Sequence, residues 1–310
     1  MFTSLPHLAT KFTKYVTSGG IIINGHTQDR LHIRQVVEAL HDYFEFIHHD
    51  DLLHQLAQKK AKPFCLLTFD DGKKVNATET ALEMERMGVP GVFYVVSEYL
   101  YGRETLWMEE YKALKSKIKL LPPCLGLDTP KELPYAILKE RLALACERFE
   151  VKVDFSDPCV GPMSWDDARL LHAKGFTIGA HSLRHSIMTN EPEDLALDDI
   201  QQSIAAVTGE VGSPCRTYAF PNGNYSTSLA RHAIDCGVET VMTTEPMWAN
   251  ASFPAWRLPR IQIYNAYNSN LVVKKVLAAL PGVLLKNPDG TGRRYIMRHL
   301  KCKVATRNID

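Results

Sequence analysis

The chain has 310 residues, enough for one α/β domain of about 200–250 residues and an elaboration of it. Lys and Arg number 36 against 35 Asp and Glu, so no net field recruits nucleic acid, and we expect no nucleic-acid partner. No apolar stretch of about 18 residues occurs, and residues 1–20 lack a continuous apolar run, which predicts neither a membrane span nor a signal peptide. The expected location is the cytoplasm, with association at a membrane surface as the alternative.

Short apolar runs bounded by turn residues alternate with amphipathic segments along the chain. Such runs are typical of strands buried on both faces, and strand-helix-strand repetition predicts a parallel sheet with crossover helices. The pattern alone allows either a closed barrel or an open, doubly wound sheet. The predicted strands are Ile21–Asn24, Pro63–Phe69, Gly91–Val96, Phe176–Ala180, Thr217–Phe220 and Thr240–Thr244. The predicted helices are Leu31–His41, Asp51–Lys60, Asn76–Met87, Trp165–Lys174, Leu195–Val207 and Ser226–Cys236.

The stretch from about 107 to 161 interrupts this alternation. It holds two helix-like segments separated by a proline-rich break, which indicates a helical insertion. We therefore predict a barrel domain over residues 1–283 that contains this insertion, followed by a basic tail at 284–310. The tail carries seven Lys or Arg against two Asp, and it is either solvated or a contact for an anionic substrate or lipid head group.

Two adjacent carboxylates follow one of the predicted strands. Asp70 and Asp71 come directly after Pro63–Phe69, and the carboxyl ends of parallel strands are where α/β folds gather their active groups. One carboxylate can bind a cation while its neighbour stays unliganded as a general base, and Gly72 allows a sharp backbone turn beneath them. Taken alone, the Asp-Asp-Gly sequence is more typical of a turn that caps a helix.

Two histidines follow another predicted strand. His181 and His185 come just after Phe176–Ala180, at a spacing of four that we expect to place both imidazoles on one side of a helical turn. With Asp71 they predict a site of two His and one carboxylate, with open positions for water and a substrate oxygen. Such a donor set suits Zn²⁺ or another divalent transition metal, whereas a lone buried His is more often simply hydrogen-bonded.

The motifs TFDDG and HSLRH resemble the first two signature motifs of the polysaccharide deacetylases, the carbohydrate esterase family that includes chitin, peptidoglycan and poly-N-acetylglucosamine deacetylases. The segments SWDDARLLHAKGFTIGAHS, GVPGVFYVVSEYL, TYAFPNG and FPAWRLPRI extend this resemblance over roughly residues 20–270, without the insertion. The resemblance implies a (β/α) barrel with about seven parallel strands and a hydrolase that removes an N-acyl group, expected to be acetyl, from an amino sugar. It implies Asp70 as general base, Asp71, His181 and His185 as metal ligands, most suitably for zinc, and a backbone N–H in the Pro221–Asn222 segment as oxyanion donor.

The sequence departs from the family pattern in two places. The third motif usually carries an Arg two residues before its Pro, where it orients the base, but Ala219 occupies that position here. We expect Arg260 or Arg257 to supply this cation from a neighbouring strand, although either could be a surface residue. No Leu-His pair follows a late strand, where the family usually keeps its general acid. Instead an early strand ends at His26, which resembles the circularly permuted branch of the family and implies His26 as the acid.

The expected partner is an N-acylated amino sugar, an oligosaccharide or a lipid-linked precursor. One alternative is a deformylase or another non-peptide C–N hydrolase on the same fold, and another is a carbohydrate-binding protein without turnover. Five aromatic residues near the expected site could stack on sugar faces or pack in the core: Trp107, Trp165, Tyr225, Trp248 and Trp256.

Overall fold

The computed structural model describes residues 18–279 except 59–61, 119 and 265–267, so the predicted basic tail lies outside the described residues. Parallel strands form the centre of the molecule, in the order β7-β6-β5-β4-β3-β1-β8 with β2 beside β3. The strands are β1 Gly20–Gly25, β2 Glu45–Phe46, β3 Phe64–Phe69, β4 Gly91–Val95, β5 Thr177–Ala180, β6 Thr217–Ala219, β7 Thr240–Met242 and β8 Ile261–Gln262. The predicted (β/α) barrel of about seven parallel strands is confirmed.

One late segment of the chain joins the two edges of the curled sheet. Leu258 accepts a hydrogen bond from Thr243 N at 2.8 Å and donates one to the carbonyl of Val241 at 2.9 Å, at the β7 edge. The β8 strand, which follows almost directly, pairs in parallel with β1 at the other edge. Because one segment pairs with both edges, the sheet closes into a barrel, and the fully buried side chain of Arg260 lies inside it.

Alternation along the strands separates the barrel interior from the layer beneath the helices. Every residue of β1, β3 and β4 is buried, which is why these strands appear in the sequence as continuous apolar runs. The barrel domain contains two apolar clusters, and Ile22, Leu66 and Tyr94 belong to the smaller of these two, inside the barrel. Their neighbours in sequence belong to the larger cluster, which packs against the helices. On β3, residues 64, 66 and 68 therefore face inward.

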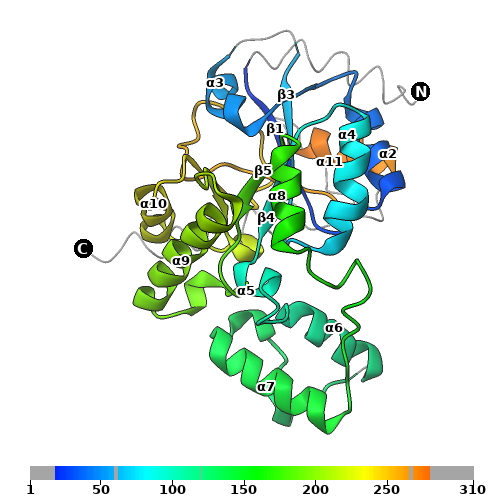
Figure 1. Ribbon diagram of the computed structural model, residues 1–310, viewed down its shortest axis with the longest axis vertical. Helices are drawn as coiled ribbons and strands as arrows, with labels where there is room; N and C mark the ends of the chain where they lie inside the picture. Colours follow the sequence, from blue (N-terminus) through cyan, green and yellow to red (C-terminus); the bar gives the residue numbers. More distant parts are fainter. Residues whose placement is uncertain (1–17, 59–61, 119, 265–267, 280–310) are drawn as a thin grey trace.

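The helices surround the barrel, and those of the predicted insertion form a separate group. Figure 1 shows α6 and α7 side by side, projecting from the barrel beyond α5. This group has its own small apolar cluster, built around Leu114, Leu138 and Leu142. The helices are α2 Arg30–Leu40, η1 His49–Asp51, α3 Leu52–Ala57, η2 Asn76–Thr80, α4 Ala81–Arg86, α5 Ser97–Leu100, α6 Trp107–Lys117, η3 Pro123–Leu125, η4 Pro130–Glu132, α7 Tyr135–Arg148, α8 Trp165–Ala173, η5 Met188–Asn190, α9 Glu193–Val211, η6 Pro221–Gly223, α10 Thr227–Asp235 and α11 Ser269–Ala278. Among the helices described, none has both the length and the apolar character that a membrane span requires.

A chain of buried polar groups runs through the barrel interior. His49 Nε2 lies 2.8 Å from Thr240 Oγ1, which donates a hydrogen bond to Thr217 Oγ1 at 2.8 Å. The Tyr94 hydroxyl lies 2.8 Å from the same Thr217 oxygen, and the Arg260 guanidinium lies 5.4 Å from the centroid of the Tyr94 ring. The chain therefore connects η1 with the cation beside the predicted base.

The histidine at the end of this chain predicts a dependence of stability on pH. Burial, followed by the charge of Arg216, lowers the pKa of His49 from 6.5 to about 4. Its neutral form is thus favoured in the folded state, so the associated stabilisation is complete above pH 6.5 and is lost as the pH falls toward 4. We expect His49→Gln to flatten the pH dependence of the unfolding free energy in this window by up to about 3 kcal/mol, measured by urea titration. His172→Gln, at an exposed position, is the control, and a His49→Gln profile parallel to that of the wild type would refute the expectation.

Candidate active site

Asp70 continues the inward-facing row of β3 and meets an arginine from the other end of the chain. Side chains alternate along a strand, so Thr68 and Asp70 share the interior face. Arg260 Nη1 donates to Thr68 Oγ1 at 3.1 Å and to Asp70 Oδ1 at 2.7 Å, while Nη2 donates to Asp70 Oδ2 at 2.9 Å. The guanidinium Nε donates to the carbonyl of Thr243 at 3.0 Å. This two-pronged contact fixes the plane of the Asp70 carboxylate.

The same contact keeps Asp70 ionised. Asp70 is 2 % exposed and Arg260 is 0 % exposed. Burial alone would raise the pKa of Asp70, but the charge of Arg260 and its hydrogen bonds to the carboxylate outweigh burial and hold the pKa below its ordinary value. The residue is therefore a carboxylate, the form that can accept a proton as a general base.

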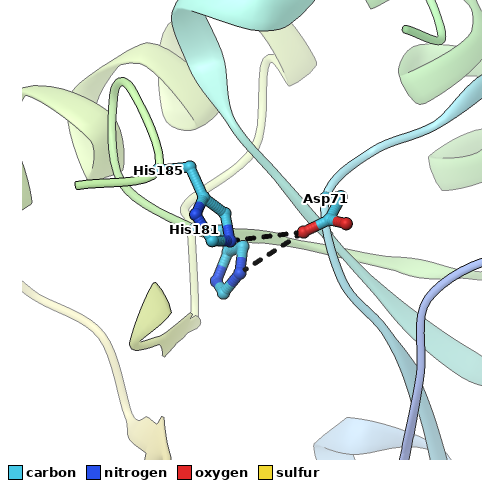
Figure 2. Close-up of side chains that lie close together, drawn as sticks. All are labelled: Asp71, His181 and His185. Carbon is cyan, nitrogen blue, oxygen red and sulfur yellow. Dashed lines mark ion pairs between the residues drawn. The ribbon is translucent and has the colours of Figure 1, made fainter. Parts of the chain in front are cut away.

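Asp71 leaves the inward row through a tight turn. Its backbone is left-handed, with φ of 77°, and Gly72 follows with φ of 72°. A β carbon at Gly72 would lie 2.9 Å from Leu100 Cδ1, which leaves room only for glycine. Asp71 Oδ1 lies 3.9 Å from His181 Nε2 and 3.4 Å from His185 Nε2. Figure 2 shows the Asp71 carboxylate pointing toward both imidazoles. The turn thus directs the two neighbouring carboxylates to different partners.

His181 and His185 do not share a helical turn, so that part of our sequence interpretation was wrong. They belong to an irregular loop with left-handed backbone at Ser182 (φ 67°) and at His185 (φ 60°). The Ser182 hydroxyl accepts a hydrogen bond from His185 N at 2.7 Å, and Asp199 Oδ1 accepts one from Leu183 N at 2.9 Å. These bonds fold the loop so that the two imidazoles meet edge to face, with centroids 5.0 Å apart.

The donor set of Asp71, His181 and His185 fits a divalent metal ion. Their ligand atoms lie within 4.8 Å of one another, and all three residues are buried. His181 Nδ1 donates to the carbonyl of Ala219 at 2.7 Å, which leaves Nε2 as the ligand atom. Asp71 Oδ1 is buried without a hydrogen-bond partner, as expected of an oxygen that a cation would satisfy. Burial lowers the pKa of His181 to about 4, so the imidazole stays in its neutral, ligating form.

Two further expectations concern His26 and the choice between arginines. His26 follows β1 directly, so it lies at the same edge of the barrel as the paired carboxylates. Burial alone would raise the pKa of Asp71, but His26 and other neighbouring groups lower it, and His26 contributes most to this lowering. His26 also contributes to lowering the pKa of Asp70. Arg257 binds Glu245 instead of Asp70, through contacts of 3.0 and 2.8 Å. Of the two candidate arginines, Arg260 is therefore the one beside the predicted base.

The third motif forms a short turn at the same edge. Pro221 and Asn222 lie in η6, directly after β6, and Asn222 has a left-handed backbone with φ of 56°. The β6 strand ends at Ala219, whose carbonyl holds His181. The segment expected to supply the oxyanion donor is therefore next to the metal-ligand group.

Helix α6 of the insertion contacts the metal-ligand group at two points that the sequence did not reveal. Trp107 Nε1 donates to the carbonyl of His185 at 3.1 Å. The Lys73 ammonium lies 3.9 Å from Asp71 Oδ2 and binds Glu109 at 2.6 Å, with both members of that pair buried. No spacing in the sequence could indicate these contacts, because they depend on how the insertion docks against the barrel.

The five aromatic residues considered for sugar stacking are buried or contact other side chains of the protein. Trp107, Trp165 and Trp248 are buried, so they pack inside the protein. Tyr225 is half-buried and its hydroxyl donates to Glu245 at 2.7 Å, while the half-buried Trp256 faces Arg231. The three buried tryptophans therefore pack in the protein interior and do not stack on a sugar face.

Comparison with known proteins agrees with this arrangement. A sequence profile of the family described as Polysaccharide deacetylase matches residues 57–241, more than half of the chain. The chain therefore belongs to the polysaccharide deacetylase family, and it is an enzyme of the N-deacetylase class. No curated protein sequence matches it.

Solved deacetylase structures have the same fold. The deacetylase PplD of Streptococcus pyogenes, determined with acetate, superimposes with a TM-score of 0.59 at 12% identity over 86% of this chain and 100% of its own. IcaB from Ammonifex degensii gives 0.55 at 16% identity over 80% of this chain and 93% of its own. The BpsB deacetylase domain from Bordetella bronchiseptica gives 0.53 at 13% identity over 79% and 96%. At such identities the similarity establishes a common fold.

The contact between Arg260 and Asp70 predicts the effect of removing the arginine. Arg260→Ala should cut turnover strongly, because the carboxylate loses the partner that orients it, and should cost about 3–5 kcal/mol of stability by leaving a buried charge unpaired. Metal content should persist, since Arg260 contacts none of the three predicted ligands. Turnover is measured by acetate release, stability by urea unfolding and metal content by elemental analysis. Arg257→Ala is the control, because Arg257 does not contact Asp70. A fully active Arg260→Ala enzyme would contradict the assignment. If that variant fails to fold, Asp70→Asn combined with Arg260→Met should recover stability but not turnover.

The Trp107 contact predicts a metal-binding defect without a change in the fold. Trp107→Phe keeps an aromatic ring, although a smaller one, and removes the N–H that holds the His185 carbonyl, so we expect Zn²⁺ affinity to fall about 10-fold, as measured by calorimetry. The unfolding free energy of the metal-free protein should fall by about 1–3 kcal/mol, because the hydrogen bond is lost and the smaller ring leaves a cavity. Trp248→Phe, which loses a hydrogen bond to the Ser18 carbonyl, is the matched control. Equal Zn²⁺ affinities for wild type and Trp107→Phe would exclude this role.

Proposed function

We propose that the protein is a metal-dependent N-deacetylase acting on an N-acylated amino sugar, either within an oligosaccharide or on a lipid-linked precursor. One observation carries the proposal: a carboxylate held ionised by Arg260 adjoins a buried donor set of one aspartate and two histidines. Membership of the polysaccharide deacetylase family supplies the class of reaction.

The three ligand-bearing residues define what the metal would contribute. Asp71, His181 and His185 would hold the ion, and two imidazoles with one carboxylate suit Zn²⁺. A bound ion would polarise the amide carbonyl of the substrate and would lower the pKa of a water molecule that it binds. The ordered Nδ1 contact of His181 and the buried, unpaired Asp71 oxygen support this assignment.

Asp70 is the general base in this proposal. Its Oδ2 lies 4.0 Å from His181 Nε2, so the carboxylate adjoins the donor set. Asp70 takes the proton of the attacking water, while Arg260 holds the carboxylate in place and offsets its burial. The arginine thereby replaces the one that the third motif lacks.

The remaining roles fall to the neighbouring strand ends. His26, protonated, gives a proton to the leaving sugar nitrogen, since an amine anion would otherwise have to depart. A backbone N–H in the turn of Pro221 and Asn222 donates to the oxyanion that forms on the acyl carbon. The position of both segments at the edge that carries Asp70 supports these roles.

Three variants separate metal binding from proton transfer. Asp70→Asn and His26→Gln should each lower acetate release from N-acetylated oligosaccharides about 10²–10⁴-fold and keep stoichiometric metal. His181→Ala should lose both metal and activity. The measurements are elemental analysis and acetate release from a panel of sugars. Metal without release from any acetylated sugar would indicate a different acyl group, such as formyl, and absence of metal in the wild type would favour a carbohydrate-binding protein.

A further inference from the structure

Lys131, in the middle of the insertion, lies against the third motif. Its Nζ donates a hydrogen bond to Asn222 Oδ1 at 2.6 Å. Asn222 Nδ2 donates in turn to Asn224 Oδ1 at 2.7 Å, so the amide of Asn222 is held with its oxygen toward the lysine. The insertion therefore places a cation beside the turn proposed to stabilise the oxyanion.

The turn that carries this lysine is fastened to the barrel. Asn190 Nδ2 donates to the carbonyl of Lys131 at 2.8 Å, and Glu191 Oε1 accepts a hydrogen bond from Tyr135 N at 2.7 Å. Asn190 and Glu191 follow closely on the loop of His185, to which Trp107 of the insertion is also bonded. Lys131 is thus positioned relative to the metal-ligand group by contacts on both sides of its turn.

The charge of Lys131 has no carboxylate partner. Within the described residues, no acidic group forms an ion pair with it, and its partner is the neutral amide of Asn222. Other lysines of the insertion differ: Lys112 binds Glu109 at 2.8 Å and Lys139 binds Glu110 at 2.7 Å. Partial burial lowers the pKa of Lys131, as expected of an ammonium that loses water without gaining an anion. The side chain remains exposed to solvent and so accessible to a ligand.

We propose that Lys131 recognises an anionic oxygen group, a phosphate or a carboxylate, on the N-acylated amino sugar. An ammonium has three N–H donors, and the contact with Asn222 uses one, which leaves two for the substrate anion. Charge-assisted hydrogen bonds of this kind are about twice as strong as neutral ones. The inference rests on the proposed function and narrows it, because it assigns the enzyme an anionic substrate.

A matched set of substrates tests this assignment. The set is an N-acetylglucosamine disaccharide, the same sugar with a phosphate monoester, and the same sugar with a carboxylate. For the wild type we expect kcat/KM to be about 10-fold or more higher for one or both anionic sugars. Lys131→Gln should abolish this preference and Lys131→Arg should largely preserve it. Lys152→Gln removes one exposed charge from the same insertion and should behave as the wild type.

Each outcome decides the matter. A preference confined to the phosphorylated sugar or to the carboxylated sugar identifies which anion Lys131 recognises. Equal wild-type activity on neutral and anionic sugars overturns the inference but leaves the deacetylase proposal standing. An equal loss on all sugars in Lys131→Gln also overturns it, since the lysine would then serve only to position Asn222. If no sugar is deacetylated, the proposed function fails. The inference about Lys131 is then tested by binding alone, through the Kd values of the same sugars for the Asp70→Asn protein, measured by calorimetry. Tighter binding of the anionic sugars that Lys131→Gln removes would support the inference, and equal Kd values would overturn it.

Discussion

The buried ion pair between Asp70 and Arg260 is the constraint on which the rest of the site depends. Removing two charges from water is costly, and the cost is offset only where nearly every donor and acceptor finds a partner. Here the guanidinium also binds Thr68 and the carbonyl of Thr243, and it lies over the ring of Tyr94. Arg260 belongs to the segment that joins both sheet edges, so closure of the barrel also orients the carboxylate of Asp70, the proposed base.

Two adjacent aspartates are given different environments by the backbone between them. Strand alternation points Asp70 into the barrel, toward a permanent cation, and the left-handed turn at Asp71 directs the next carboxylate toward two imidazoles. The left-handed backbone at His185 is held by the hydrogen bond from its N–H to the Ser182 hydroxyl. The result is one carboxylate paired with Arg260, the proposed base, and one beside two imidazoles, the proposed metal ligand.

The insertion belongs to the site as well as to the surface of the molecule. Trp107 holds the carbonyl of a predicted ligand, Glu109 binds the lysine beside Asp71, and Lys131 reaches the third motif. The barrel has the fold of solved deacetylase structures, whereas an elaboration at the carboxyl ends of the strands can vary with the substrate. The insertion contacts the site but supplies none of the proposed catalytic groups, so changes in it can alter substrate specificity without altering the reaction.

The sequence by itself determined the class of fold and predicted that Asp71, His181 and His185 lie together, because strand patterns and the positions of these residues after strands are local properties. It could not choose between Arg260 and Arg257, since that choice depends on barrel closure, which brings together residues 190 positions apart. It also suggested a helical turn for His181 and His185, where bonds from distant groups instead impose an irregular loop. The contacts of the insertion were invisible for the same reason. Local patterns set the face on which a side chain lies, but only tertiary packing decides what that face meets.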